Sequence, residues 1–168
     1  MDQPTTIFAE WMRAHIGVLH RISRAFAHSA DQHDLMQELM LAMWKAAPAF
    51  RGGSAPSTFI YRVSLNRALT WRRSETKRNR RAAEADAQWH SIANEPADQA
   101  EAELLDRLYG AIRQLRLVDR ALILMALDGV PHREIGRIHG FTETNVAVRL
   151  NRARQQISIL MKEQDDEL

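Results

Sequence analysis

The chain has 168 residues, which is enough for one domain or two small ones. Hydrophobic residues make up 45% of it and the formal net charge is only +2, which excludes a chain that is disordered throughout. There is no cysteine, which excludes a disulfide framework and any thiolate metal site.

The first part of the chain predicts a bundle of three helices. Apolar residues recur at helical spacing over 8–26 and, after a short break, over 31–47. A loop rich in Gly, Ser and Pro follows, and an uninterrupted third helix is predicted over 57–81. Because short loops join these helices, we assign residues 1–81 to one small helical domain.

The predicted helix over 57–81 is apolar on two sides and cationic at its end. Its stripes are Phe59, Ile60, Val63 and Trp71 on one side and Tyr61, Leu65, Ala68 and Leu69 on the other. Between Arg62 and Arg81 there are eight Lys or Arg and one acid, Glu75. Two stripes predict contacts on two sides, and clustered Arg beside aromatic rings is typical of nucleic-acid surfaces. A core helix with a solvated charged end is the alternative.

The sign of the charge inverts after this helix. Seven acids and no Lys or Arg occur from Glu84 to Asp106. We interpret residues 82–98 as a linker between two domains. A flexible connection and an acidic segment that mimics nucleic acid near a basic surface both remain open.

Residues 99–168 predict a second helical domain, so the expected fold is all-α. Apolar periodicity indicates helices over 104–115 and 118–127, and no segment alternates with the period of a strand. A third helix begins after Pro131, and Thr142 can cap a long final helix. The buried stripe expected on the final helix is Val146, Leu150, Ala153, Ile157 and Leu160.

Residues 131–154 match a helix-turn-helix. Gly136 stands where the two helices must cross closely, and Gly140 suits a turn residue with positive φ. The second helix of such a motif can enter a major groove, with its N-terminal residues near base edges and its arginines near phosphates. The candidate DNA-contacting residues are Glu143, Thr144, Asn145, Val148, Arg149, Arg152 and Arg154.

Three motifs in a fixed order resemble the extracytoplasmic function (ECF) group of bacterial RNA polymerase sigma factors. The family's Asp-Leu-x-Gln-Glu signature is similar to residues 34–38, and its Trp-Leu-Tyr-x-Ile-Ala-x-Asn segment to residues 59–66. Its Thr-Val-x-Ser-Arg-Leu-x-Arg-Ala-Arg helix is similar to residues 145–154. The resemblance covers about residues 8 to 162 and implies two domains joined by a linker.

The resemblance also implies partners for each surface. Core RNA polymerase would be bound through its β′ clamp helices and its β subunit, promoter DNA through both domains, and an anti-sigma factor would hold the chain inactive. The residues implied for the β′ clamp helices are Asp34, Gln37, Glu38 and Leu41. Those implied for the −10 promoter box are Phe59, Arg62, Asn66, Arg67, Arg72 and Arg73. The helix-turn-helix would contact the −35 box. One apolar stripe of the helix over 57–81 would pack on the preceding helix, and the other edge, with Asn66 and the arginines, would face promoter DNA.

The function we expect is therefore that of an alternative sigma factor, which binds core polymerase, recognises and opens a promoter and starts transcription. A polymerase-independent helix-turn-helix regulator and a sigma-mimicking antagonist are the alternatives. We expect no enzymatic activity, no cofactor and no metal, because the closest histidine set, His28 and His33, lies across a predicted helix break. No secretory signal or long apolar run is present, so a cytoplasmic protein without membrane insertion is expected.

Overall fold

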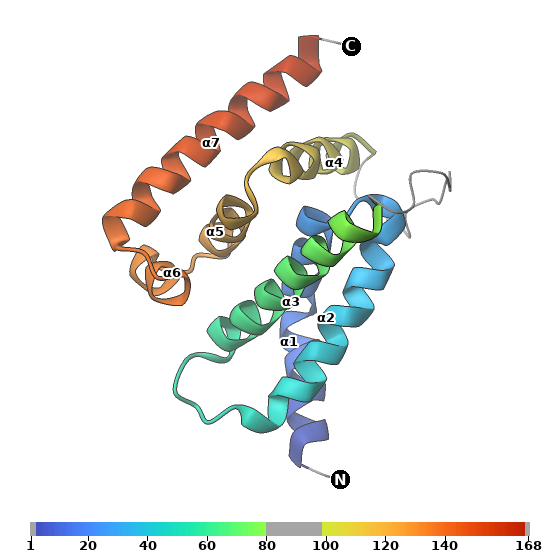
Figure 1. Ribbon diagram of the computed structural model, residues 1–168, viewed down its shortest axis with the longest axis vertical. Coiled ribbons are helices and arrows are strands. Elements are labelled where there is room, and N and C mark those ends of the chain that lie inside the picture. The colour runs from blue at the N-terminus through green and yellow to red at the C-terminus, as the bar shows by residue number, and fades with distance from the viewer. Residues whose placement is uncertain (1–2, 80–98, 167–168) are drawn as a thin grey trace. The chain divides into compact units, whose positions relative to one another are not determined.

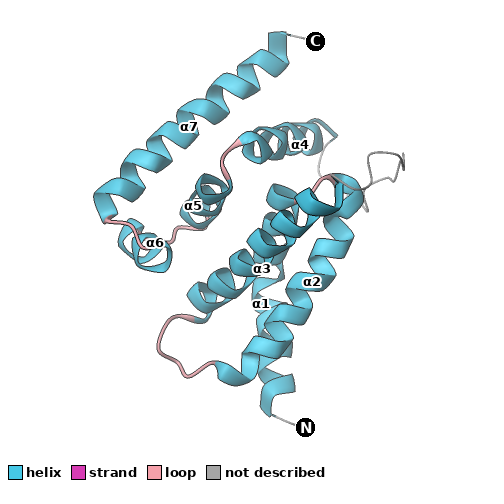
Figure 2. Cartoon of the chain, viewed as in Figure 1, coloured by secondary structure: helices cyan, strands magenta, loops and turns pink. Residues whose placement is uncertain are grey.

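The computed structural model describes residues 3–79 and 99–166. Within these ranges the chain forms seven α-helices and two single-turn 3-10 helices and contains no strand, so the prediction of an all-α fold is confirmed (Figure 2). The helices belong to two compact units, α1–α3 and α4–α7 (Figure 1). The linker predicted over 82–98 lies outside the described residues, and the domain bounds drawn from the sequence stay predictions.

The first unit is a bundle of three helices that pack against one another in every pair. They are α1 (Gln3–Phe26), α2 (Gln32–Ala46) and α3 (Pro56–Asn79). The short helices η1 (Ser29–Asp31) and η2 (Ala47–Ala49) flank α2. The fully buried side chains of the core include Leu19, Ile22, Phe26, Leu35, Leu39, Met43, Ile60, Tyr61 and Leu65.

Helix α3 corrects one expectation about its apolar stripes. We expected one stripe to pack on the preceding helix and the other edge to face DNA, but residues of both stripes are buried. Ile60 and Trp71 from one stripe and Tyr61, Leu65 and Ala68 from the other are at most 6% exposed. The physical reason is that α3 packs against α1 as well as α2, so the two stripes are neighbouring edges of one wide buried side.

Three aromatic rings close one end of the first unit. The rings of Trp11, Phe50 and Phe59 lie 5.2 to 5.5 Å apart between centroids, in tilted or edge-on arrangements. Aromatic rings favour such arrangements over face-to-face stacking. Phe50 lies at the start of the loop before α3, so the cluster ties that loop to α1 and α3.

The second unit contains α4 (Gln99–Gln114), α5 (Leu117–Leu127), α6 (His132–His139) and α7 (Glu143–Asp166). Its core includes Ile112, Leu122, Leu124, Ile135 and Leu150. Arg120 is buried among them, and its guanidinium donates to the backbone carbonyls of Leu115 and Arg113. These carbonyls lie at the C-terminal end of α4, where a cation is favoured because the helix leaves carbonyls without partners inside it.

The helix-turn-helix formed by α6 and α7 has the geometry that its sequence predicts. Gly140 ends α6 with a φ of 73°. At Gly136, a Cβ atom would lie 2.4 Å from the carbonyl oxygen of Phe141, so only glycine fits without a shift of the backbone. The Thr142 hydroxyl accepts a hydrogen bond from the backbone N–H of Asn145 at 3.2 Å, which makes it the cap of α7.

Candidate polymerase and nucleic-acid interfaces

The outer face of α2 is acidic at one end and apolar at the other. Asp34, Gln37 and Leu41 are exposed, and Glu38 is partly exposed. Trp44, which was not among the predicted contacts, continues this face with 53% of its surface exposed. The spacing could have revealed it, because residues 34, 37, 41 and 44 follow the three-and-four rhythm of a single helix face. We call these four residues the α2 face.

Helix α3 leaves one polar stripe in water. Its members follow one another at spacings of four, four and three residues, and they are Arg62, Asn66, Thr70 and Arg73. The Thr70 hydroxyl donates to the Asn66 carbonyl at 2.9 Å, and the Arg62 guanidinium lies over the Phe59 ring at 5.4 Å. Thr70 was not among the predicted contacts, although its spacing from Asn66 indicates it. We call these four residues the α3 stripe.

Three of the residues predicted for the −10 box, Phe59, Arg67 and Arg72, lie off this stripe. Phe59 is 8% exposed and packs in the aromatic cluster, so it offers little surface to a partner in the free chain. Arg72 is half-buried on a different side of the helix. The six residues predicted for the −10 box therefore do not form one surface.

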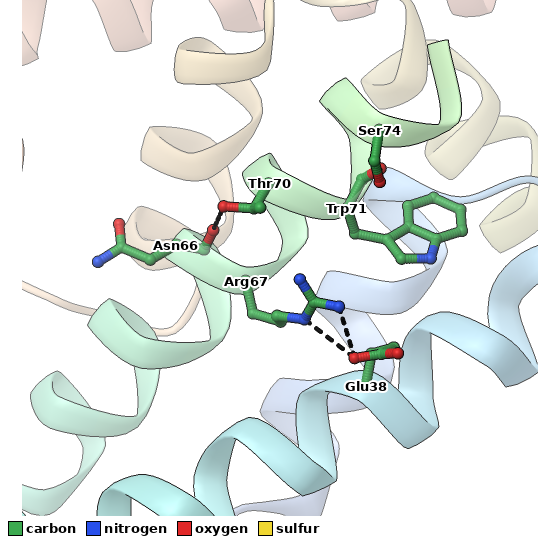
Figure 3. A network of polar contacts seen from close by, with 6 residues as sticks. All are labelled: Glu38, Asn66, Arg67, Thr70, Trp71 and Ser74. Atoms are coloured by element: carbon green, nitrogen blue, oxygen red, sulfur yellow. Dashed lines mark hydrogen bonds and ion pairs between the residues drawn. The ribbon is translucent and has the colours of Figure 1, made fainter. Parts of the chain in front are cut away.

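Arg67, predicted for DNA, and Glu38, predicted for polymerase, are bonded to each other. Arg67 Nε and Nη2 both donate to Glu38 Oε2, at 3.0 and 2.6 Å (Figure 3). The side chains are 33% and 39% exposed, respectively. The structure therefore brings together two residues for which the family resemblance implies different partners.

The exposed side of α7 carries most of the residues predicted for the −35 box. Thr144, Val148 and Arg152 are exposed, with Asn145 beside them and Glu143 in the first turn. Asn151 and Gln155 share the side of Thr144 and Val148 at helical spacing. This side is polar apart from Val148.

Arg149 and Arg154 differ from that set. Arg149 Nη1 donates to Asp119 Oδ1 at 2.9 Å, and its guanidinium lies 4.7 Å from the centre of the Phe141 ring. It therefore ties α7 to α5. Arg154 is exposed, but it lines a groove about a quarter of a turn away from the side of Thr144 and Val148.

The groove is formed by α4, α5 and α7 and has a volume of about 490 Å³. Its lining is mostly apolar, with Arg154 and Lys162 contributed by α7. The lining residues include Leu108, Ile112, Ile123, Leu127, Ile157 and Met161. Leu127 is 63% exposed, so a substantial apolar surface faces water here. The predicted buried stripe of α7 accordingly ends in half-exposed residues at Ile157 and Leu160.

His139, at the end of α6, has a ring nitrogen without a partner. Nε2 is buried and makes no hydrogen bond within the described part of the chain. Burial lowers the pKa of His139 below its ordinary value of 6.5, because the charged imidazolium loses hydration. Among the side chains that the structure describes, no group of three or more His, Cys, Asp or Glu could hold a metal ion. No described helix meets the length and hydropathy that a membrane span requires.

Each of the two units contains a match to a known family model. Residues 11–78 match the model of Sigma-70 region 2, and residues 105–157 match that of Sigma-70, region 4. ECF RNA polymerase sigma factor SigM of Mycobacterium tuberculosis (strain H37Rv) is 28% identical over 156 residues, which are 92% of this chain and 76% of SigM. The chain is an ECF sigma factor. It is therefore an alternative sigma factor that directs transcription initiation.

Other relatives of this sigma factor agree in sequence and in fold. The ECF RNA polymerase sigma-E factor of Escherichia coli K12 is 27% identical over 142 residues, covering 79% of this chain and 74% of that protein. CnrH, solved with the cytosolic domain of CnrY, has a TM-score of 0.64 at 21% identity, covering 93% of this sigma factor and 88% of CnrH. RpoE of Bartonella quintana, solved with the anti-sigma factor NepR, has a TM-score of 0.71 at 18% identity, with coverages of 92% and 96%.

Proposed function

We propose that this sigma factor divides its task between three surfaces. The α2 face binds core RNA polymerase, the α3 stripe engages the −10 promoter box, and the exposed side of α7 reads the −35 box as duplex DNA. The observation that carries the proposal is the α3 stripe, because it leaves a row of polar and cationic side chains on a helix whose apolar side is buried.

The composition of the α2 face supports a protein partner. Leu41 and Trp44 expose apolar surface beside Asp34 and Gln37. A large aromatic ring surrounded by polar groups is typical of the residues that contribute most to protein interfaces. An acidic and apolar face is unsuited to DNA, since phosphates repel the carboxylate. We therefore propose the β′ clamp helices of the polymerase as its partner.

The α3 stripe supports contact with an opened promoter strand. Arg62 and Arg73 can neutralise phosphates, while Asn66 offers an amide that can donate to and accept from the edge of an unstacked base. Thr70 adds a hydroxyl, although in the free chain its proton is donated to the Asn66 carbonyl. We propose that these four residues replace the longer set predicted from the sequence.

The side of α7 around Thr144, Val148 and Arg152 supports duplex reading. It begins at a capped helix N-terminus, where backbone N–H groups and short polar side chains can approach phosphates and base edges. Arg149 is engaged with Asp119 in the free chain, so a contact from Arg149 to DNA would have to replace that ion pair.

The apolar groove of the second unit supports a partner helix. Its lining residues would stay in water without one, and Arg154 and Lys162 favour an occupant with acidic residues on its polar side. We propose a helix of the polymerase β subunit as the occupant. We propose an anti-sigma factor as a further partner, because both solved neighbours are complexes, one of them with an anti-sigma factor. The proposed activity is non-enzymatic, uses no cofactor and takes place in the cytoplasm.

Run-off transcription on a genomic DNA library tests this proposal. Purified protein with core polymerase should produce start sites that core polymerase alone does not. Asp34→Lys should reduce core binding, whereas the matched variant Glu10→Lys, an exposed acid on α1, should not. Core binding without any new start site would indicate an antagonist. Sequence-specific DNA binding without core binding would indicate a polymerase-independent regulator.

A further inference from the structure

The ion pair between Glu38 and Arg67 joins α2 to α3. Two N–H groups of one guanidinium donate to the same carboxylate oxygen, and the partners are 29 residues apart in sequence. Both are only about one-third exposed. Within the described residues, the structure gives neither side chain another hydrogen bond or ion pair.

Apolar packing and the ion pair both restrict the rotation of α3. Ile60, Tyr61 and Leu65 are at most 1% exposed and pack closely in the core. A guanidinium that donates through both Nε and Nη2 adds a directional contact, because its planar N–H groups reach a carboxylate only along one edge. The pair therefore reinforces one rotation of α3 on α2.

That rotation decides where the α3 stripe points. Asn66 directly precedes Arg67, and Figure 3 shows its side chain pointing away from the ion pair. Any turn of α3 that breaks the Arg67 contact also re-aims Asn66 and Thr70, because all three belong to the same rigid helix. The contact between Arg67 and Glu38 thus helps to set the direction in which the α3 stripe faces.

We propose that Glu38 and Arg67 are a positioning pair, and that neither is a direct contact to polymerase or promoter DNA. Their task is to couple the α2 face to the α3 stripe, so that core polymerase bound on α2 holds the stripe in the orientation that a promoter strand needs. This inference rests on the function proposed above and replaces the separate roles that the sequence suggested for these two residues.

A charge exchange separates positioning from direct contact. Glu38→Arg and Arg67→Glu alone should each lower the rate of initiation by roughly threefold to tenfold at a promoter mapped with the wild-type protein, a range that charge coupling of this kind allows. The double variant E38R/R67E restores an ion pair with reversed polarity. It should recover initiation to within about twofold of wild type, while core affinity stays unchanged in all three proteins.

A direct contact would behave differently. If Glu38 touched polymerase, arginine at that position would weaken core binding in the double variant as well. If Arg67 touched a phosphate, glutamate there would keep initiation low despite the exchange. Either result, or single variants that initiate like wild type, would overturn the proposal.

The conservative variant Arg67→Lys adds a second readout. It keeps the positive charge and loses the planar fork, so we expect initiation to fall by about threefold with an unchanged Tm. A phosphate contact would tolerate lysine, and full activity of this variant would therefore count against positioning. The matched controls are Glu10→Arg and Arg13→Glu, two exposed charges on α1 outside the proposed surfaces.

Initiation by the wild-type protein distinguishes a failure of the proposed function from a failure of the positioning role. If wild type with core polymerase starts no transcription, the proposed function fails and the positioning role that rests on it fails as well. If wild type is active and the exchange does not rescue, the positioning role alone fails.

Discussion

At the scale of single residues, Gly136 has no room for a side chain. The carbonyl oxygen of Phe141 occupies the place of a side chain there, and the backbone N–H of Phe141 donates to the Gly136 carbonyl at 2.9 Å. Gly136→Ala should therefore push α6 away from the turn and lower the free energy of unfolding of this unit by about 1–3 kcal/mol. Urea denaturation followed by circular dichroism measures the loss.

Gly53→Ala is the matched control for this change. Gly53 lies in the loop before α3 and has no atom within 4 Å of an added Cβ. The alanine should leave stability unchanged or raise it slightly, because it restricts the unfolded chain. Equal effects of the two substitutions would contradict the steric account.

His139 makes the second unit sensitive to acid. Well above pH 6.5 the imidazole is neutral in the folded and the unfolded chain, so it contributes no pH dependence there. As the pH falls below 6.5, the unfolded chain takes up a proton that the folded chain resists, because burial lowers the pKa of the folded form. Stability should therefore fall between neutral pH and pH 5.

The comparison variant is His139→Gln, which cannot titrate. Urea unfolding of both proteins at several pH values isolates the His139 contribution, since the other histidines are common to both. A wild-type protein whose stability falls no faster with acid than that of the variant would contradict this role for His139.

At the scale of elements, α2 and α3 each carry a tryptophan with a different task. Trp44 is 53% exposed and Trp71 is 6% exposed. Trp44→Ala should leave the folded state nearly unchanged and weaken core binding by about 2 kcal/mol, which is roughly 30-fold in Kd. Trp71→Ala should instead destabilise the first unit by about 3–5 kcal/mol. Titration of labelled core polymerase and thermal unfolding distinguish the two effects.

Some features of these helices could be predicted from the sequence and others could not. Helix existence, the cap at Thr142 and the turn at Gly140 could all be predicted, because each depends on neighbours a few residues away. The burial of both stripes of α3 could not, because it depends on α1 packing against α3, which begins at residue 56, 30 residues after α1 ends at residue 26. The contact between Arg67 and Glu38 is of the same long-range kind.

At the scale of the whole molecule, each compact unit buries its own core. The first encloses Leu35, Ile60 and Tyr61, and the second encloses Leu122, Ile135 and Leu150. We therefore expect fragments 1–81 and 99–168 to fold separately, with helical circular dichroism and cooperative melting. A fragment that melts without cooperativity would contradict the independence of that unit, and the intact chain is the reference for both melting curves.

Because the α3 stripe carries two arginines, its affinity for a promoter strand should depend on the salt concentration. A surface that engages a strand through cations releases counterions, so its affinity should fall steeply as salt rises, with a slope of about −0.7 in log K against log salt for each phosphate neutralised on a single strand. Replacing Arg62 or Arg73 by Gln should make that slope less steep by about one such step, because one phosphate contact is lost. Thr70→Val should weaken binding with the slope unchanged, because threonine carries no charge. Fluorescence titration of a single-stranded −10 oligonucleotide with the holoenzyme, from 50 to 300 mM salt, measures these slopes. Cells that accumulate potassium under osmotic stress would thus weaken this promoter contact without any change in the amount of protein.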